Sequence, residues 1–116
     1  MREREAGVSA TVGDNPVYVF CDETAEPGHA FHARMFAPRL GIPEDPATGA
    51  AAAAFAGVLA ARGGLADGEH AMTIEQGYEM GRPSLIRLRL LIAAGQLVSA
   101  SVGGDAVIVT QGTIEA

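Results

Sequence analysis

The stretch Gly49–Arg62, GAAAAAFAGVLAAR, decides the fold of this chain. It holds eight alanines, the best helix-forming residue, and it ends at an arginine in front of Gly63-Gly64, a typical helix stop. No polar side chain stands between Ala50 and Ala61, and a helix that is apolar on all sides is expected to be enclosed by other elements. We therefore predict one central helix with a β-sheet wrapped around it.

The segments before this helix have the patterns of strands and loops. Val17–Phe20 is a short run of β-forming residues, and Cys21 at its end is expected to pack as a small hydrophobe. Ala30–Phe36 alternates in the manner of a strand, with His32 expected on its solvated side. Three prolines predict an irregular connection over Ala37–Thr48.

After the helix the pattern predicts strands over four segments: Ala71–Gln76, Ser84–Ile92, Leu97–Val102 and Ala106–Thr110. In the second of these, the aliphatic residues alternate with Arg87 and Arg89, which predicts one buried and one wet face. Tight turns at Ala94-Gly95-Gln96 and Gly103-Gly104-Asp105 make the last three strands antiparallel. The expected fold class is α+β, an antiparallel sheet wrapped around one central apolar helix.

The composition and charge of the chain limit the functions that it can have. The chain has 116 residues, about one domain, so we expect a single domain over 1–116 with a polar lead-in over 1–13. A net charge of -6 with scattered arginines argues against nucleic-acid binding. The absence of lysine excludes an internal Schiff base with pyridoxal phosphate and a P-loop lysine. The longest apolar run is too short to span a membrane. The charged start Met1–Glu5 and the single cysteine favour a cytoplasmic location.

The segment in front of the helix can carry chemistry. The backbone amides of Gly49, Ala50 and Ala51 stand at a helix start, where unpaired N–H groups can receive a carboxylate. Asp45 could exchange a proton with an acid bound there. The alternative is that Asp45 is the N-cap and Pro46 the first helical residue, a common start of a helix.

The turn Gln76–Ser84 is the second candidate segment. It reads as a hairpin loop whose glycines adopt positive φ. The alternative is a rim of the same pocket, with Arg82 or Ser84 contacting an anion. A zinc site can also be imagined from His29, His32, His70 and Cys21, but their spacing matches no tight ligand pair, so we expect no metal.

Three stretches together resemble the phenazine-biosynthesis PhzF-like family: Arg34–Pro38, Gly41–Ala51, and Gln76-Gly77 with Met80–Ser84. The closing Val102-Gly103-Gly104 and Val107–Val109 are similar to the tail of the family. The resemblance covers nearly the whole chain from about Val17 onward, but only the C-terminal half of the family.

The resemblance implies the fold of diaminopimelate epimerase, in which two similar halves each wrap a sheet around a helix and the active site lies between them. It also implies a cofactor-free isomerase or epimerase that moves a proton on a small carboxylic acid. Asp45 matches the acid/base aspartate of the second half, and Gly49 and Ala50 match positions whose amides hold the substrate carboxylate. The family usually has serine where Ala50 stands, so a hydroxyl contact is missing. The family's turn motif includes Gly77, Arg82 and Ser84, at the rim of the pocket or in a structural role.

Three hypotheses follow. The chain can be an isomerase domain completed by a complementary N-terminal half or by a second copy in a homodimer, with Asp45 and its twin facing one another. It can be a module that binds a small carboxylate without turning it over. It can also be a structural or oligomerising domain without activity.

Overall fold

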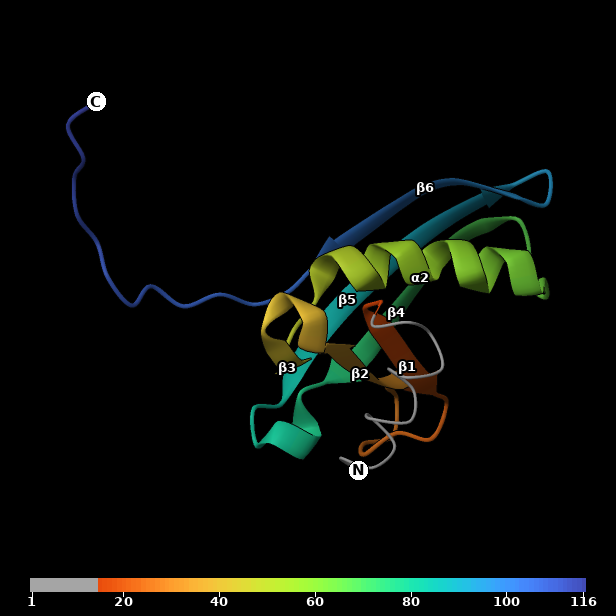
Figure 1. The fold of residues 1–116 in the computed structure, drawn as a ribbon. Coiled ribbons are helices and arrows are strands. Elements are labelled where there is room, and N and C mark those ends of the chain that lie inside the picture. The colour runs from red at the N-terminus through yellow and green to blue at the C-terminus, as the bar shows by residue number, and fades with distance from the viewer. Residues whose placement is uncertain (1–14) are drawn as a thin grey trace.

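The computed structural model describes residues 15–116, so the expected lead-in over 1–13 lies outside this part (Figure 1). One α-helix, α2 (Gly49–Arg62), has the bounds that the sequence predicts. The strands are β1 (Val17–Cys21), β2 (Phe31–Ala37), β3 (Ile42–Asp45), β4 (Gly68–Gln76), β5 (Ser84–Ala93) and β6 (Gln96–Gly103). Two short 3-10 turns are η1 (Pro38–Leu40) and η2 (Tyr78–Met80).

The six strands form one sheet. Its order is β1-β2-β4-β5-β6, and β3 pairs with the C-terminal end of β2. Every neighbouring pair is antiparallel except β2 and β4, which are parallel. The parallel pair has a physical reason: the chain passes through α2 between these strands, and such a crossover is long enough to bring the next strand back in the same direction. The sheet is therefore mixed, where the sequence predicted an antiparallel one, and the α+β class is confirmed.

The core lies between α2 and the face of the sheet that α2 crosses (Figure 1). The alternation predicted in β5 is confirmed, because its four inward aliphatic side chains are at most 7% exposed: Ile86, Leu88, Leu90 and Ile92. From the helix, the core receives Ala52, Phe55, Ala56 and Leu59. The small alanines let the helix lie close to the sheet.

Phe55 is the centre of an aromatic cluster at the β1 side of the core. Its ring centroid lies 4.4 Å from that of Phe20, 5.0 Å from that of Phe31 and 5.6 Å from that of Tyr18. Tilted and edge-on rings at these distances are favourable. Phe55 thus joins the helix to β1 and β2.

The opposite side of α2 is open in the described part of the chain. Ala54, Gly57 and Ala61 are exposed there, and Val58 retains 45% of its accessible surface. The prediction that the helix is enclosed on all sides is therefore wrong for residues 15–116. The sheet covers one side of α2, and an apolar strip faces outward.

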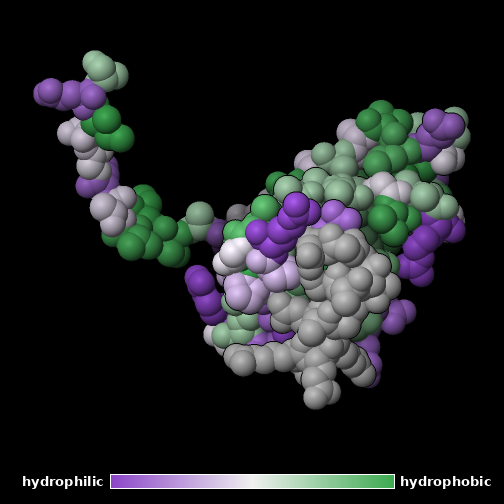
Figure 2. Space-filling model, in the orientation of Figure 1, coloured by the Kyte–Doolittle hydropathy of each residue, from purple (hydrophilic) through white to green (hydrophobic). Residues whose placement is uncertain are grey.

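The last predicted strand, Ala106–Thr110, and the hairpin turn before it are not formed. After β6 the chain leaves the sheet as an extended tail (Figure 1), and its apolar side chains project away from the body (Figure 2). Val107, Ile108 and Val109 are 85%, 87% and 87% exposed. The β propensity of these residues is real, but no described strand lies beside them to pair with.

Two smaller predictions are also wrong. Cys21 does not pack as a hydrophobe: it is exposed, and its Sγ donates a hydrogen bond to the carbonyl of Glu23 at 3.4 Å. The connection Ala37–Thr48 contains regular structure, since β3 pairs with β2 through Met35 and Asp45. No described helix is long and apolar enough to cross a membrane.

Candidate functional site

The loop between β3 and α2 places Asp45 in front of the helix. Asp45 is the last residue of β3, and the helix begins four residues later, with Thr48 as its N-cap. The alternative in which Asp45 caps the helix is therefore wrong. The Thr48 hydroxyl makes no capping bond to the helix and donates instead to Asp45 Oδ2.

The first turn of α2 offers backbone donors that have no acceptor among residues 15–116. The first backbone bond of the helix runs from Ala52 N to Thr48 O, at 3.1 Å. The amides of Gly49, Ala50 and Ala51 precede it, so the helix supplies no acceptor for them. These three N–H groups carry the partial positive charge of a helix N-terminus, which favours a carboxylate.

The Gln76 side chain holds the loop between β3 and α2 in place. Gln76 is fully buried at the end of β4. Its Nε2 donates to Asp45 O at 2.8 Å and to Thr48 Oγ1 at 2.9 Å, while its Oε1 accepts from Thr48 N at 3.2 Å. One amide thus fixes both ends of the loop. Sequence reasoning gave no individual role to Gln76 or Thr48, because their contact joins positions far apart in the chain.

Gly77 is required by its surroundings. Its φ is 83°, and a Cβ placed on it would lie 2.3 Å from Arg82 O and 2.7 Å from Pro46 O. Only glycine allows the turn after β4 to lie this close to the loop before the helix. The structure therefore places Gly77 behind the loop. It confirms the positive φ expected in this turn, which the sequence read as a hairpin loop.

A hollow of about 470 Å³ adjoins the helix start. It lies between the helix start, β5 and the end of β6, and its lining is Ala47, Gly49, Pro83, Ser84, Leu85, Ile86, Val102, Gly103, Gly104 and Asp105. This volume is in the range of small-molecule sites. Two of the predicted site residues, Gly49 and Ser84, line it.

The other predicted residues lie around the hollow. Asp45, Ala50 and Ala51 belong to the loop and first turn beside it, and Arg82 is exposed on the turn before β5. The Ser84 hydroxyl donates to Arg82 O at 3.3 Å. The structure thus gathers the predicted residues at one end of the helix.

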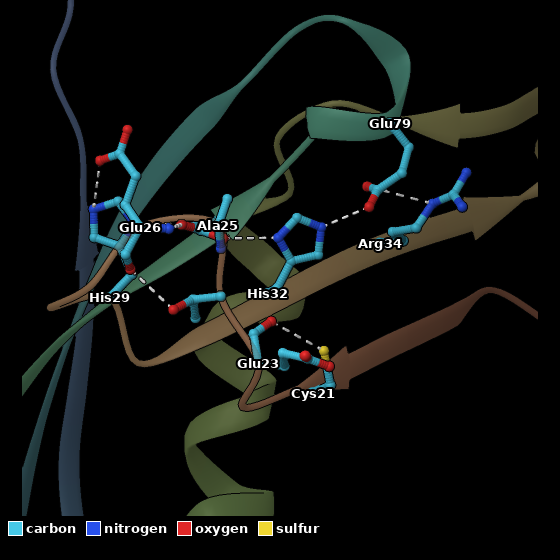
Figure 3. A network of polar contacts seen from close by, with 10 residues as sticks. Cys21, Glu23, Ala25, Glu26, His29, His32, Arg34 and Glu79 are labelled. Carbon is cyan, nitrogen blue, oxygen red and sulfur yellow. Dashed lines mark hydrogen bonds and ion pairs between the residues drawn. The ribbon is translucent and has the colours of Figure 1, made fainter.

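A second polar group, the carboxylate–histidine cluster, consists of Glu75, Glu79, His29 and His32. Glu75 follows the core residue Ile74 in β4, so its side chain points to the face of the sheet away from α2. None of the four residues of the carboxylate–histidine cluster lines the hollow. Figure 3 shows His32 and Glu79 of this cluster pointing toward one another, with Arg34 beside Glu79.

Glu75 is fully buried and accepts four hydrogen bonds. The donors are Ala25 N at 2.8 Å, Glu26 N at 3.1 Å, His29 Nδ1 at 2.5 Å and His32 Nδ1 at 2.8 Å. Burial alone would raise the pKa of this carboxyl, but the donors outweigh burial and lower the pKa to about 2. Glu75 is therefore a carboxylate that ties the loop after β1 to the sheet.

His32 lies between two carboxylates. Its Nδ1 is 2.8 Å from Glu75 Oε1 and its Nε2 is 2.6 Å from Glu79 Oε2, so both ring nitrogens must donate. Burial lowers the pKa of His32, yet the hydrogen bonds and charges of Glu75 and Glu79 raise it overall. The expectation of a solvated His32 is wrong, because the parallel register places it opposite Glu75.

Comparisons with known proteins support the likeness seen in the motifs. The sequence profile of the phenazine biosynthesis-like (PhzC-PhzF) family matches residues 4–112. An uncharacterized isomerase of Mesorhizobium japonicum is 52% identical over 97 residues, which are 84% of this chain and 32% of that protein. A trans-2,3-dihydro-3-hydroxyanthranilate isomerase of Pseudomonas chlororaphis is 42% identical over 75% of this chain and 31% of its own length.

A solved structure gives the same fold. The phenazine biosynthesis protein of Bacillus anthracis, of the PhzF family, superposes with a TM-score of 0.70 at 22% identity, over 82% of this chain and 33% of that one. The chain thus spans about a third of the length of the relatives that it matches. By its profile, its relatives and its fold, the chain belongs to the phenazine biosynthesis-like (PhzF) family.

Proposed function

We propose that this chain is a domain of a cofactor-independent isomerase that moves a proton on a small carboxylic acid. In this proposal the substrate carboxylate binds the amides of Gly49, Ala50 and Ala51, and Asp45 is the acid/base group. The observation that carries the proposal is the position of Asp45: Thr48 holds its carboxylate, and the loop that leads from it to the helix start lines a hollow through Ala47 and Gly49.

The relatives support the same reaction type. Those with an assigned activity are named trans-2,3-dihydro-3-hydroxyanthranilate isomerases, and that compound is a small cyclic acid with one carboxylate. A carboxylate and a nearby carbon that gives up a proton are what the helix start and Asp45 would engage.

The proposed site needs a contribution from outside the described residues. Among the side chains lining the hollow, Asp105 is the one ionisable group, and it lies 2.9 Å from Arg87 Nη2. The hydrogen bond and charge of Arg87 lower the pKa of Asp105, so this carboxyl stays ionised and is unsuited to donate a proton. We propose that a complementary N-terminal half, or a second copy in a homodimer, supplies the second group, in a protein of the cytoplasm.

A second candidate is a module that binds a carboxylate without turnover. Ala50 favours it, because alanine brings an amide but no hydroxyl to the bound acid. The open apolar side of α2 favours an oligomerising role in the same way, since large bare patches usually mark interfaces.

One experiment distinguishes the two candidate functions. The chain is mixed in D₂O with trans-2,3-dihydro-3-hydroxyanthranilate, alone and after addition of a separately expressed N-terminal half of a relative, and proton exchange is followed by NMR. The isomerase proposal expects exchange that Asp45→Asn abolishes and that Asp22→Asn, an exposed control outside the site, leaves unchanged. Binding without exchange in both mixtures would favour the second candidate. No binding at millimolar acid would contradict both.

A further inference from the structure

The hydrogen-bond pattern around Asp45 has a single arrangement of protons. Thr48 N can only donate, and Asp45 O can only accept, so the Gln76 amide must present its oxygen to the first and its nitrogen to the second. The second N–H of Gln76 then points at Thr48 Oγ1, at 2.9 Å. Because the Thr48 hydroxyl accepts that bond, its own proton is free to be donated, and Asp45 Oδ2 is the acceptor.

This arrangement makes the two oxygens of Asp45 unequal. Oδ2 receives the Thr48 proton and is held as an acceptor, while Oδ1 receives no hydrogen bond from any described residue. The hydrogen bond from the hydroxyl fixes the plane of the carboxylate group. The buried Gln76 amide keeps the hydroxyl in this orientation, since the reverse orientation would point two donors at one another.

We propose that Thr48 and Gln76 are positioning residues that reserve Oδ1 of Asp45 for proton transfer. The inference rests on the proposed function of Asp45. In the step itself a C–H bond of the acid breaks, the proton goes to Oδ1 and the electron pair stays on the conjugated substrate. The second group of the proposed site gives a proton to a different carbon, and proton exchange with water returns both groups to their starting states. The isomerisation balances without an oxidant or reductant.

Several charged groups of the neighbouring elements have partners of their own. Arg34 binds Glu44 of β3 through two nitrogens, at 2.8 and 2.6 Å. Glu75 of β4 is bound to the histidines, and Asp105 beyond β6 is bound to Arg87. Among the described residues, the hydrogen bond that the Asp45 carboxylate receives comes from the Thr48 hydroxyl.

The test is ¹³C NMR of the Asp45 carboxyl in the free chain at one fixed, neutral pH, which needs no substrate. Thr48→Val keeps the shape of the side chain and removes the hydroxyl, whereas Thr48→Ser keeps the hydroxyl. We expect Thr48→Val to displace the Asp45 carboxyl ¹³C resonance from its wild-type position, because the hydrogen bond from the hydroxyl is lost, and Thr48→Ser to leave the resonance near the wild-type position. Thr110→Val, in the exposed tail, is the matched control and should change nothing.

An Asp45 carboxyl resonance at the same position in wild type and Thr48→Val, or displaced equally in both Thr48 variants, would overturn the proposal. If Thr48→Val fails to fold, the unaltered chain still decides: the Thr48 hydroxyl proton should exchange slowly with water, and a fast-exchanging proton would count against the arrangement. The expected carboxyl resonances can be found in a chain without isomerase activity, and activity can be present in a chain without them, so the two proposals are tested separately.

Discussion

Replacing Glu75 by glutamine should destabilise the chain, because Glu75 is the buried acceptor for two backbone amides and two imidazoles. Glutamine has one acceptor oxygen, and its NH₂ group would face donors. The lowering of the Glu75 pKa from 4.5 to about 2 corresponds to about 3 kcal/mol of folding free energy at neutral pH. His29 and His32 are partly exposed, so solvent screening reduces this contribution to the folding free energy. We therefore expect Glu75→Gln to lower the free energy of unfolding by about 2 kcal/mol.

The sign of the pH dependence follows from the direction of each shift. A lowered pKa stabilises the fold above the unfolded value of 4.5, and this contribution is lost as the pH falls toward about 2. A raised pKa, as in His32, stabilises the fold below the unfolded value of 6.5 and is lost as the pH rises through the folded value. The cluster therefore contributes most between these two unfolded values.

The assay is thermal and urea unfolding of wild type and Glu75→Gln, followed by circular dichroism from pH 7 down to pH 3. At pH 7 the variant should melt about 10 °C lower, and the difference should narrow as the pH falls below 4.5. Glu69→Gln, an exposed glutamate in the same strand, is the matched control and should melt with the wild type. A difference that is absent, or that is the same at every pH, would refute the reasoning.

Two further predictions concern packing, and urea unfolding measures both. Phe55→Ala should lower the free energy of unfolding by about 4 kcal/mol, because it removes the ring that joins α2 to three aromatic neighbours. Val58→Ala, on the open side of the helix, should lower it by under about 1 kcal/mol. Equal losses in the two variants would contradict the packing described. Gly77→Ala should lower the free energy of unfolding by about 3 kcal/mol, since the added Cβ meets two carbonyl oxygens. Gly81→Ala should lower it by only about 1 kcal/mol, because Gly81 also has a positive φ but a Cβ there would meet no neighbouring atom. A Gly77 variant as stable as the Gly81 variant would disprove the close approach.

The sequence predicts the elements whose pattern is local. α2 is set by its alanines and its glycine stop, and β5 by strict alternation, so their positions need no knowledge of partners. β3 was missed because it has four residues, one of them proline, and is defined by its pairing with β2. The segment after Gly103 shows the reverse error: its residues favour a strand, but propensity alone supplies no neighbouring strand.

The site was predictable where a motif marks it and not where long-range contacts build it. The helix-start amides follow from the alanine-rich segment, whereas the pattern alone also allowed Asp45 to cap the helix, and its acid/base role is what the family resemblance implies. Gln76 reaches Thr48 across 28 positions, and His32 reaches Glu75 across 43, through the parallel pairing of β2 and β4. No spacing in the sequence reveals such contacts, because they depend on which strands become neighbours.

The central claim is that the first-turn amides of α2 hold a carboxylate, and removing one amide tests it most directly. Gly49→Pro deletes an N–H at the first helical position, where proline fits and where Thr48 already has the extended backbone that precedes proline. Gly49→Ala keeps the N–H and adds a Cβ in ordinary contact with Val102.

The measurement is the affinity of the chain for anthranilate, a stable aromatic carboxylate, followed through the amide resonances of Ala50 and Ala51. We predict that Gly49→Pro raises Kd about tenfold while Gly49→Ala stays near wild type. Equal affinity in wild type and Gly49→Pro, with resonance changes elsewhere in the chain, would contradict the claim.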